Sequence, residues 1–196
     1  MMHPDDGTAA VRIARGAIIQ EVTRKPLAYM IRLTDNEKHG VFVTVSTYPS
    51  RDLRGCIGFT EPVYPLSEAL EYAARSACRD PRFPPLREKE LDKVVVEVTI
   101  LTPPEPMIVK EKEELLNTIK IGRHGLMLEY RGRRGVFLPQ VPAEWGWDVK
   151  EYLENLCMKA GVSKDKWKES DCNIFSFEGR IFGETSPNGD VEEVKC

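Results

Sequence analysis

The stretch KVVVEVTILT, residues 93–102, constrains the fold of this chain more than any other segment. Its interior is almost continuously apolar and β-branched, which is typical of a strand at the centre of a sheet. Glu97 is the one charged residue in that interior, and a carboxylate is costly to bury without a partner. We therefore predict a central strand whose Glu97 either lies at a sheet edge or pairs with an arginine, such as Arg54 or Arg79.

Two more segments predict strands that pair with each other. Residues 40–47, GVFVTVST, alternate between apolar and polar in the period of a strand. The turn-forming residues 48–52, YPSRD, then lead into residues 53–60, LRGCIGFT, as an antiparallel partner. This pairing predicts that Cys56 lies near the centre of the sheet or on a bulge.

The rest of the chain predicts helices between pairs of strands. An amphipathic helical pattern follows the cap candidates Asp6 and Thr8 and continues to about Arg24. The other predicted elements are helices over 65–77, 110–119 and 148–161, a hairpin over 124–140 and a strand over 174–184. Because strand pairs alternate with helices, we predict an α+β fold with helices packed on a mostly antiparallel sheet.

Composition and charge limit the classes of function. The chain has 196 residues, 41% of them hydrophobic and 30% charged, which is the profile of a globular protein. Its formal net charge of −3 argues against a general nucleic-acid binder. The N-terminus lacks the pattern of a signal peptide and no apolar run approaches a membrane span, so we expect a cytoplasmic protein. The five cysteines include no C-x-x-C pair, which predicts free thiols and no zinc ribbon.

The residues LRGCIG, 53–58, form the first candidate site. Gly55 and Gly58 flank Cys56, although glycine weakens a strand unless close approach is needed. One interpretation is that the glycines permit close packing or a bulge, with Cys56 as a small buried hydrophobic residue. The other is that the thiol is exposed beside Arg54, whose cation favours a thiolate nucleophile or metal ligand. The spacing of two favours the second interpretation, because these two side chains share one face of a regular strand.

The residues CRDPRF, 78–83, form a second candidate site with two interpretations. Asp80 precedes a proline and is a natural helix stop, with Arg79 and Arg82 pairing with it or with the last helix carbonyls. Alternatively, the two arginines lie across a cleft from Cys56 and bind a phosphate or carboxylate.

Further along the chain, Gln140 lies between two prolines in LPQVP. It either offers its amide to a ligand or orients the helix that follows. The basic tip of the predicted hairpin, RGRR, has no accompanying aromatic platform for base stacking, so we consider nucleic-acid contact there less favoured.

Five segments, in this order, resemble the AMME chromosomal region candidate gene one family, the AMMECR-one domain. They are LRGCIG, AARSACRDPRFPPL, VEVTILTPPEPM, GVFLPQVPAEWGWD and YLENLCMKAGV. The resemblance implies one α+β domain over residues 5–184, with a larger and a smaller lobe and the LRGCIG strand facing the cleft. The polar residues 185–196 predict a flexible C-terminal tail after this domain. The resemblance implies no known reaction, but family domains occur beside Memo-type and radical-SAM domains, which implies a protein partner from such a pathway.

Three hypotheses about function follow. The leading one is a ligand-binding or modification site with Cys56 as the catalytic thiol, working on or with a partner protein. Its ligand-binding residues would be Arg54, Gly55, Gly58, Arg79, Asp80, Arg82 and Gln140. The alternative is a non-enzymatic adaptor or scaffold that binds a protein or peptide, and nucleic-acid binding is the third. The sequence has neither a Walker loop nor a G-x-S-x-G motif, and it indicates no cofactor.

Overall fold

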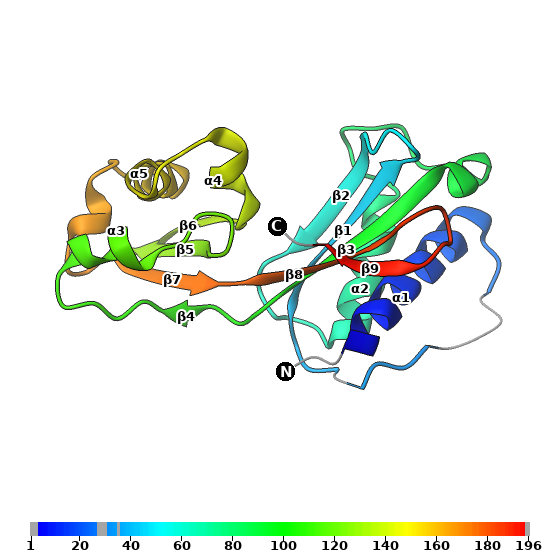
Figure 1. Ribbon diagram of the computed structural model, residues 1–196, viewed down its shortest axis with the longest axis horizontal. Helices are drawn as coiled ribbons and strands as arrows, with labels where there is room; N and C mark the ends of the chain where they lie inside the picture. The colour runs from blue at the N-terminus through cyan, green and yellow to red at the C-terminus, as the bar shows by residue number, and fades with distance from the viewer. Residues whose placement is uncertain (1–3, 27–30, 35, 195–196) are drawn as a thin grey trace. The chain divides into compact units, whose positions relative to one another are not determined.

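The structure is a computed structural model that describes residues 4–26, 31–34 and 36–194 (Figure 1). Its chain forms two compact units, each with its own antiparallel sheet and helices. The larger unit comprises the chain up to Leu101 and again from Arg180, and the smaller unit comprises Thr102–Gly179. The α+β class predicted from the sequence is confirmed.

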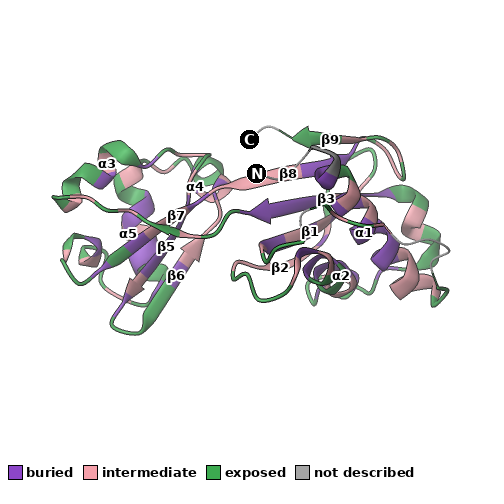
Figure 2. Cartoon of the chain, turned by 90° about the horizontal axis from the view of Figure 1, so that it is seen from below, coloured by how far each residue is buried: buried purple, intermediate pink, exposed green. Residues whose placement is uncertain are grey.

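The larger unit contains a five-stranded sheet with the order β2-β1-β3-β8-β9. These strands are β1 (Gly40–Thr47), β2 (Leu53–Phe59), β3 (Val94–Leu101), β8 (Gly179–Glu184) and β9 (Val191–Val194). The predicted antiparallel pairing of β1 with β2 is confirmed. The strand predicted from residues 93–102 is also confirmed, since β3 lies third of five and is buried along most of its length (Figure 2).

Helices α1 (Pro4–Thr23) and α2 (Leu66–Ala77) pack on one face of this sheet (Figure 1). The strands supply alternate residues to the shared core, as a period of two requires. In β1 these are Val41, Val43 and Val45, each buried among the helix side chains. The residues between them, including Thr44, therefore belong to the opposite face of the sheet.

Helix α2 buries one stripe of its surface, as the sequence predicts. The buried residues recur at helical spacing and are Leu66, Ala69, Leu70, Ala73, Ala74 and Ala77. A short 3-10 helix, η1 (Glu88–Lys93), then leads into β3. The small alanine side chains allow the helix to approach the sheet closely, which matters for the glycines of β2.

The smaller unit contains a four-stranded sheet with the order β4-β7-β5-β6. Its strands are β4 (Glu105–Pro106), β5 (Gly125–Tyr130), β6 (Arg133–Phe137) and β7 (Asn173–Phe177). The helices are α3 (Leu115–Thr118), α4 (Gln140–Trp145) and α5 (Val149–Lys159), with 3-10 turns η2 (Lys112–Glu114) and η3 (Lys166–Lys168). The predicted hairpin is confirmed as β5 and β6.

The predicted capping box of α5 is also confirmed. The Asp148 side chain accepts from the Glu151 amide at 2.8 Å, and the Glu151 side chain accepts from the Asp148 amide at 3.0 Å. Two donors at the helix N-terminus are thereby satisfied reciprocally.

Two boundaries differ from the sequence prediction. Helix α1 begins at Pro4, and Asp6 lies inside the helix, where its Oδ1 accepts from the Thr34 amide at 2.7 Å. Proline needs no amide partner in a first turn, so the helix starts before the expected caps. The strand predicted over residues 174–184 is two strands, β7 and β8, because the chain passes there from one sheet to the other.

Residues beyond 184 contain a strand that the sequence prediction of a loose tail did not include. Strand β9 pairs with β8 in antiparallel register, with Glu184 opposite Val191. An edge strand is held by backbone hydrogen bonds, so it can form from residues with few hydrophobic side chains. Residues 195–196 of the expected tail lie outside the described residues.

Candidate functional site

Cys56 lies on an edge strand of the larger unit's sheet, so its predicted place near the sheet centre is wrong. The predicted bulge does exist nearby, but it falls on another residue. Val45 pairs with Gly55 and Ser46 pairs with Leu53, which leaves Arg54 as the extra residue. Cys56 itself lies in regular register opposite Thr44.

The backbone of Cys56 is held by a pair of side chains from the segment after α2. The Cys56 amide donates to Asp80 Oδ2 at 2.9 Å, and Arg82 Nη2 donates to the Cys56 carbonyl oxygen at 3.3 Å. An edge strand presents such groups unpaired, and here Asp80 and Arg82 take the place of a neighbouring strand. We call this pair the edge clamp.

The edge clamp is itself a tight ion pair. Arg82 Nη2 lies 2.6 Å from Asp80 Oδ2, and the Arg82 amide donates to Asp80 Oδ1 at 3.0 Å. The Arg82 side chain, followed by the two amides, holds the pKa of the Asp80 carboxyl well below its usual range, against the opposing effect of burial. Asp80 is therefore a carboxylate with its hydrogen bonds already satisfied by the protein.

Packing alone accounts for the two glycines of LRGCIG. A Cβ at Gly55 would lie 2.3 Å from the carbonyl oxygen of Ala77 in α2. A Cβ at Gly58 would lie 2.1 Å from the carbonyl oxygen of Val41 in β1. Both contacts are with backbone atoms that cannot move aside, so both positions require glycine.

The other two candidate arginines, Arg54 and Arg79, pair with other carboxylates. Arg54 Nε donates to Glu90 Oε1 at 2.9 Å, and Arg79 forms an ion pair with Glu21. The predicted partnership of either arginine with Glu97 is therefore wrong. Glu97 is also not at a sheet edge, because β3 is the central strand.

A row of side chains crosses the face of the sheet opposite α1 and α2. Cys56 on β2 pairs with Thr44 on β1, and Thr44 also pairs with Glu97 on β3. Gly183 on β8 follows, since a Cβ there would lie 3.6 Å from Glu97 Cγ. We call the face that carries Cys56, Thr44, Glu97 and Gly183 the thiol face.

Thr44 connects the thiol to this row. Its Oγ1 donates a hydrogen bond to Cys56 Sγ over 3.3 Å, and the thiol is half-buried. This bond holds the Cys56 side chain against Thr44 of the neighbouring strand. Arg54 contributes nothing comparable by direct contact, because its guanidinium donates to Glu90.

Glu97 has an unusual electrostatic environment. Burial raises the pKa of its carboxyl group, and the positive charge of Arg51 opposes this only in part. Among the residues that the structure describes, none forms a hydrogen bond or ion pair with the Glu97 carboxylate. A carboxyl group perturbed in this way beside a cavity is a candidate functional residue.

That cavity has a volume of about 410 Å³ and belongs entirely to the larger unit. It is lined by Ser46, Arg51, Val95, Glu97, Gly183, Glu184, Thr185, Glu192 and Val194. Sequence reasoning treated Glu97 as a structural residue and missed Thr44, Arg51 and Gly183. Strand alternation was the available signal, because it assigns Thr44 and Glu97 to the face away from the apolar residues.

Gln140 lies in the smaller unit, where it is the first residue of α4. The structure thus brings Cys56, Asp80 and Arg82 together, while Arg54 and Arg79 contact other carboxylates. Within the described ranges there is no cluster of three or more histidine, cysteine or acidic residues that could hold a metal ion. Cysteines 78, 157 and 172 are buried in the two cores.

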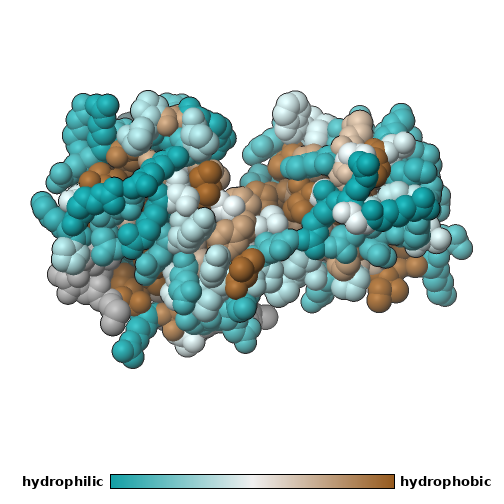
Figure 3. Space-filling model, turned by 180° about the vertical axis from the view of Figure 1, so that it is seen from behind, coloured by the Kyte–Doolittle hydropathy of each residue, from teal (hydrophilic) through white to brown (hydrophobic). Residues whose placement is uncertain are grey.

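Helix α1 is the longest helix in the described part of the chain. No helix there is both long and apolar enough to cross a membrane. On the face shown in Figure 3, hydrophilic side chains cover most of the surface and hydrophobic side chains gather in smaller patches.

Comparison with known proteins supports the family resemblance. The sequence model of the AMMECR1 family matches residues 11–182. Protein MJ0810 of Methanocaldococcus jannaschii is 51% identical over 193 residues, covering 97% of this chain and 96% of that protein. Protein MK0488 of Methanopyrus kandleri is 44% identical over 197 residues, covering 96% and 93%.

A solved structure agrees with the fold. The crystal structure of uncharacterized protein PH0010 from Pyrococcus horikoshii superposes with a TM-score of 0.82 at 42% identity. The match covers 100% of this chain and 99% of that one. The family match over most of the sequence and the likeness of these relatives show that the chain belongs to the AMMECR1 family.

Proposed function

We propose that this protein binds a small molecule at the thiol face and reacts with it through Cys56. The observation that carries the proposal is the hydrogen bond from Thr44 Oγ1 to Cys56 Sγ on a half-buried cysteine. The edge clamp supports it, because Asp80 and Arg82 fix the backbone on both sides of the Cys56 peptide unit. A nucleophile held in one position reacts faster than a mobile one.

Residues that the sequence suggested as ligand-binding have structural roles in this proposal. In this proposal Thr44 polarises the thiol, and Asp80 and Arg82 are positioning residues. Gly55 and Gly58 bring β2 close to α2 and β1. A protein partner from a Memo or radical-SAM pathway, which the family resemblance implies, stays a prediction.

The test is alkylation of the reduced native protein with iodoacetamide from about pH 5 to 9, with each cysteine followed by mass spectrometry. We expect Cys56 to react before Cys78 and Cys172, because burial raises the pKa of both these thiols to about 11. Cys157 is fully buried and should also react slowly. Protection of Cys56 until the protein unfolds would overturn the proposal.

A matched variant isolates the hydrogen bond. Thr44→Val keeps the shape of the side chain and removes the hydroxyl donor to Cys56 Sγ. We expect slower alkylation of Cys56 in this variant near neutral pH and unchanged labelling of Cys78. Equal Cys56 rates in the two proteins would show that Thr44 does not activate the thiol.

A second candidate function, non-enzymatic protein or peptide binding, is favoured by an aromatic cluster at the end of β2. Phe59 packs against Tyr64 with ring centroids 5.9 Å apart, and Tyr64 stacks on Tyr72 at 6.0 Å. Tyr72 is 58% exposed, and exposed aromatic residues are common at protein interfaces. This function predicts a partner that co-purifies equally with the parent and Cys56→Ser proteins but is lost with Tyr72→Ala.

A further inference from the structure

The cavity on the thiol face exists because β8 carries glycine beside Glu97. A Cβ at Gly183 would lie 3.6 Å from both Glu97 Cγ and Val194 Cγ2, which is ordinary contact distance. Any larger side chain would extend into the space that now forms the cavity. The hollow therefore lies directly against the side chain of Glu97.

The carboxylate at this hollow is the feature that most needs a partner. Burial raises the pKa of the Glu97 carboxyl group, because the charged form loses hydration there, and the charge of Arg51 opposes this. A charge taken out of water is costly until it is paired or hydrogen-bonded. A ligand that supplied a positive charge and hydrogen-bond donors would relieve this cost when it bound.

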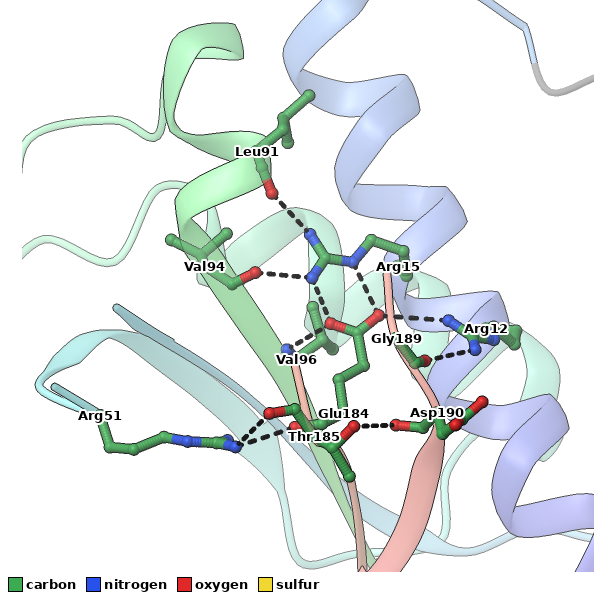
Figure 4. Close-up of polar contacts among 10 residues, drawn as sticks. All are labelled: Arg12, Arg15, Arg51, Leu91, Val94, Val96, Glu184, Thr185, Gly189 and Asp190. Carbon is green, nitrogen blue, oxygen red and sulfur yellow. Dashed lines mark hydrogen bonds and ion pairs between the residues drawn. The ribbon is translucent and has the colours of Figure 1, made fainter. Parts of the chain in front are cut away.

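Arg51 does not supply that partner. Its Nη2 donates to the backbone carbonyl oxygens of Glu184 and Thr185, each at 3.1 Å (Figure 4). This anchors the guanidinium to the wall of the cavity. It influences Glu97 only through its charge.

The two other glutamates at the cavity, Glu184 and Glu192, differ in where their side chains lie. Glu184 contributes backbone to the wall, while its carboxylate accepts from Arg15 and from the Val96 amide in the interior (Figure 4). Glu192 lines the cavity opposite Gly183 in the β8–β9 pair. Two carboxylates, Glu97 and Glu192, thus face one guanidinium, and the cavity has an excess of negative charge.

The remaining lining residues define the shape of a ligand that would fit. Val95 and Val194 provide apolar walls, and Ser46 provides a hydroxyl that can accept a hydrogen bond. A metal ion needs several ligands, and the described residues here do not form a group of three or more acidic, histidine or cysteine side chains that could hold one. An ammonium group on a short alkyl chain matches both the charge and the walls.

We propose that this cavity binds the ammonium group of a small aliphatic amine, with Glu97 as its counter-ion and Val95 and Val194 against the alkyl chain. The proposal concerns the cavity alone and does not require Cys56 to react. It thus goes beyond the proposed function and can fail or hold independently of it.

The test is titration of the full-length protein with n-butylammonium at low salt, followed by amide chemical shifts in NMR spectra. We expect saturable shifts centred on Gly183 and Glu97, and no such shifts with butanol or with butyrate. Saturable binding of butyrate in place of the amine, or no saturable shift with the amine, would overturn the proposal.

Two variants locate the binding. Glu97→Gln preserves the shape of the side chain and should weaken n-butylammonium binding by about tenfold or more, as expected for a lost charged hydrogen bond. Gly183→Ala should also weaken binding, because its methyl group fits without a clash and fills part of the hollow. The matched control is Glu68→Gln, which removes the same charge from the exposed side of α2 and should bind normally.

These variants also separate the cavity from the thiol. Cys56→Ala should bind n-butylammonium as the parent does, whereas Glu97→Gln should retain iodoacetamide labelling of Cys56. Unchanged amine affinity in both Glu97→Gln and Gly183→Ala, with each variant folded by circular dichroism, would show that the amine binds elsewhere.

Discussion

Glu184 and Glu97 lie on neighbouring strands of one sheet, and their carboxylates differ in how many hydrogen bonds they accept. Glu184 on β8 is fully buried and accepts from Arg15 Nε and the Val96 amide, both at 3.0 Å (Figure 4). Glu97 on β3 faces a cavity and accepts no hydrogen bond from any described residue. The described residues thus satisfy the Glu184 carboxylate with hydrogen bonds and leave the Glu97 carboxylate without one.

This difference in hydrogen bonding indicates that Glu184 has a structural role and that Glu97 is a candidate functional residue. Glu184 joins β8 to α1 and β3, because Arg15 also donates to the carbonyl oxygens of Leu91 and Val94. These bonds fasten a strand that returns to the larger unit from far along the chain. Glu97 forms no hydrogen bond or ion pair with any residue in the described ranges, so no such contact there offsets the partial burial of its carboxyl group.

The largest effect is expected from Glu184→Gln. The variant leaves the Arg15 guanidinium buried without its counter-ion, and we expect a loss of about 3–5 kcal/mol in the free energy of unfolding. Denaturant unfolding followed by circular dichroism would measure it. Glu68→Gln is the control and should change stability by less than about 0.5 kcal/mol. A loss below about 1 kcal/mol for Glu184→Gln would mean that the network contributes little to the fold.

An intermediate effect is expected from Asp80→Asn, which weakens the edge clamp. The amide side chain has one acceptor oxygen for four donors, so we expect a loss of about 1–3 kcal/mol at pH 7 and faster hydrogen exchange at the Cys56 amide. Normal exchange at that amide would contradict the role of Asp80 in holding the strand edge.

The pH dependence of the edge clamp has a definite sign. The pKa of Asp80 is lower in the folded protein than in the unfolded chain, so its stabilisation is full above about pH 4. It is lost as the pH falls toward the folded value. The free energy of unfolding of Asp80→Asn should therefore approach that of the parent protein in acid.

The smallest change in the free energy of unfolding is expected from Glu97→Gln, and it is a gain or no change where the preceding variants lose stability. The pKa of Glu97 is raised in the folded protein, so its contribution to stability is greatest below about pH 4 and falls as the pH rises through the folded value. We expect the variant to equal or exceed the parent in stability at pH 7, by less than about 1 kcal/mol. Unfolding curves at pH 4 and pH 7 would measure the change, and destabilisation at pH 7 would reveal a hidden partner of Glu97.

Much of the fold was predictable because its signals are local. Alternation identified β1, and the turn residues 48–52 identified β2 as its partner. Helical spacing identified the buried stripe of α2, and the Asp148–Glu151 pair identified the start of α5. Each of these patterns depends only on residues within one or two turns or strands. The end of the sheet was harder, because β9 forms by pairing with β8 and has little hydrophobic pattern of its own.

The candidate site was predictable only in part. LRGCIG and CRDPRF pointed to Cys56, Asp80 and Arg82, which do lie together. The partners of Arg54 and Arg79 are 36 and 58 residues distant, and no local pattern specifies them. Gly183 lies 86 positions from Glu97 in the sequence, and only the pairing of β3 with β8 creates the cavity between them.

The sequence by itself determined most of the strands and helices, the α+β class and the family, because propensity, periodicity and motifs are carried by neighbouring residues. Tertiary structure alone decided that Cys56 lies on an edge strand, that Glu184 has its donors and that Glu97 has none from the part of the chain that the structure describes. The physical reason is that strand order and ion pairing are settled by contacts between segments far apart in the chain, where the lowest free energy depends on the whole sheet.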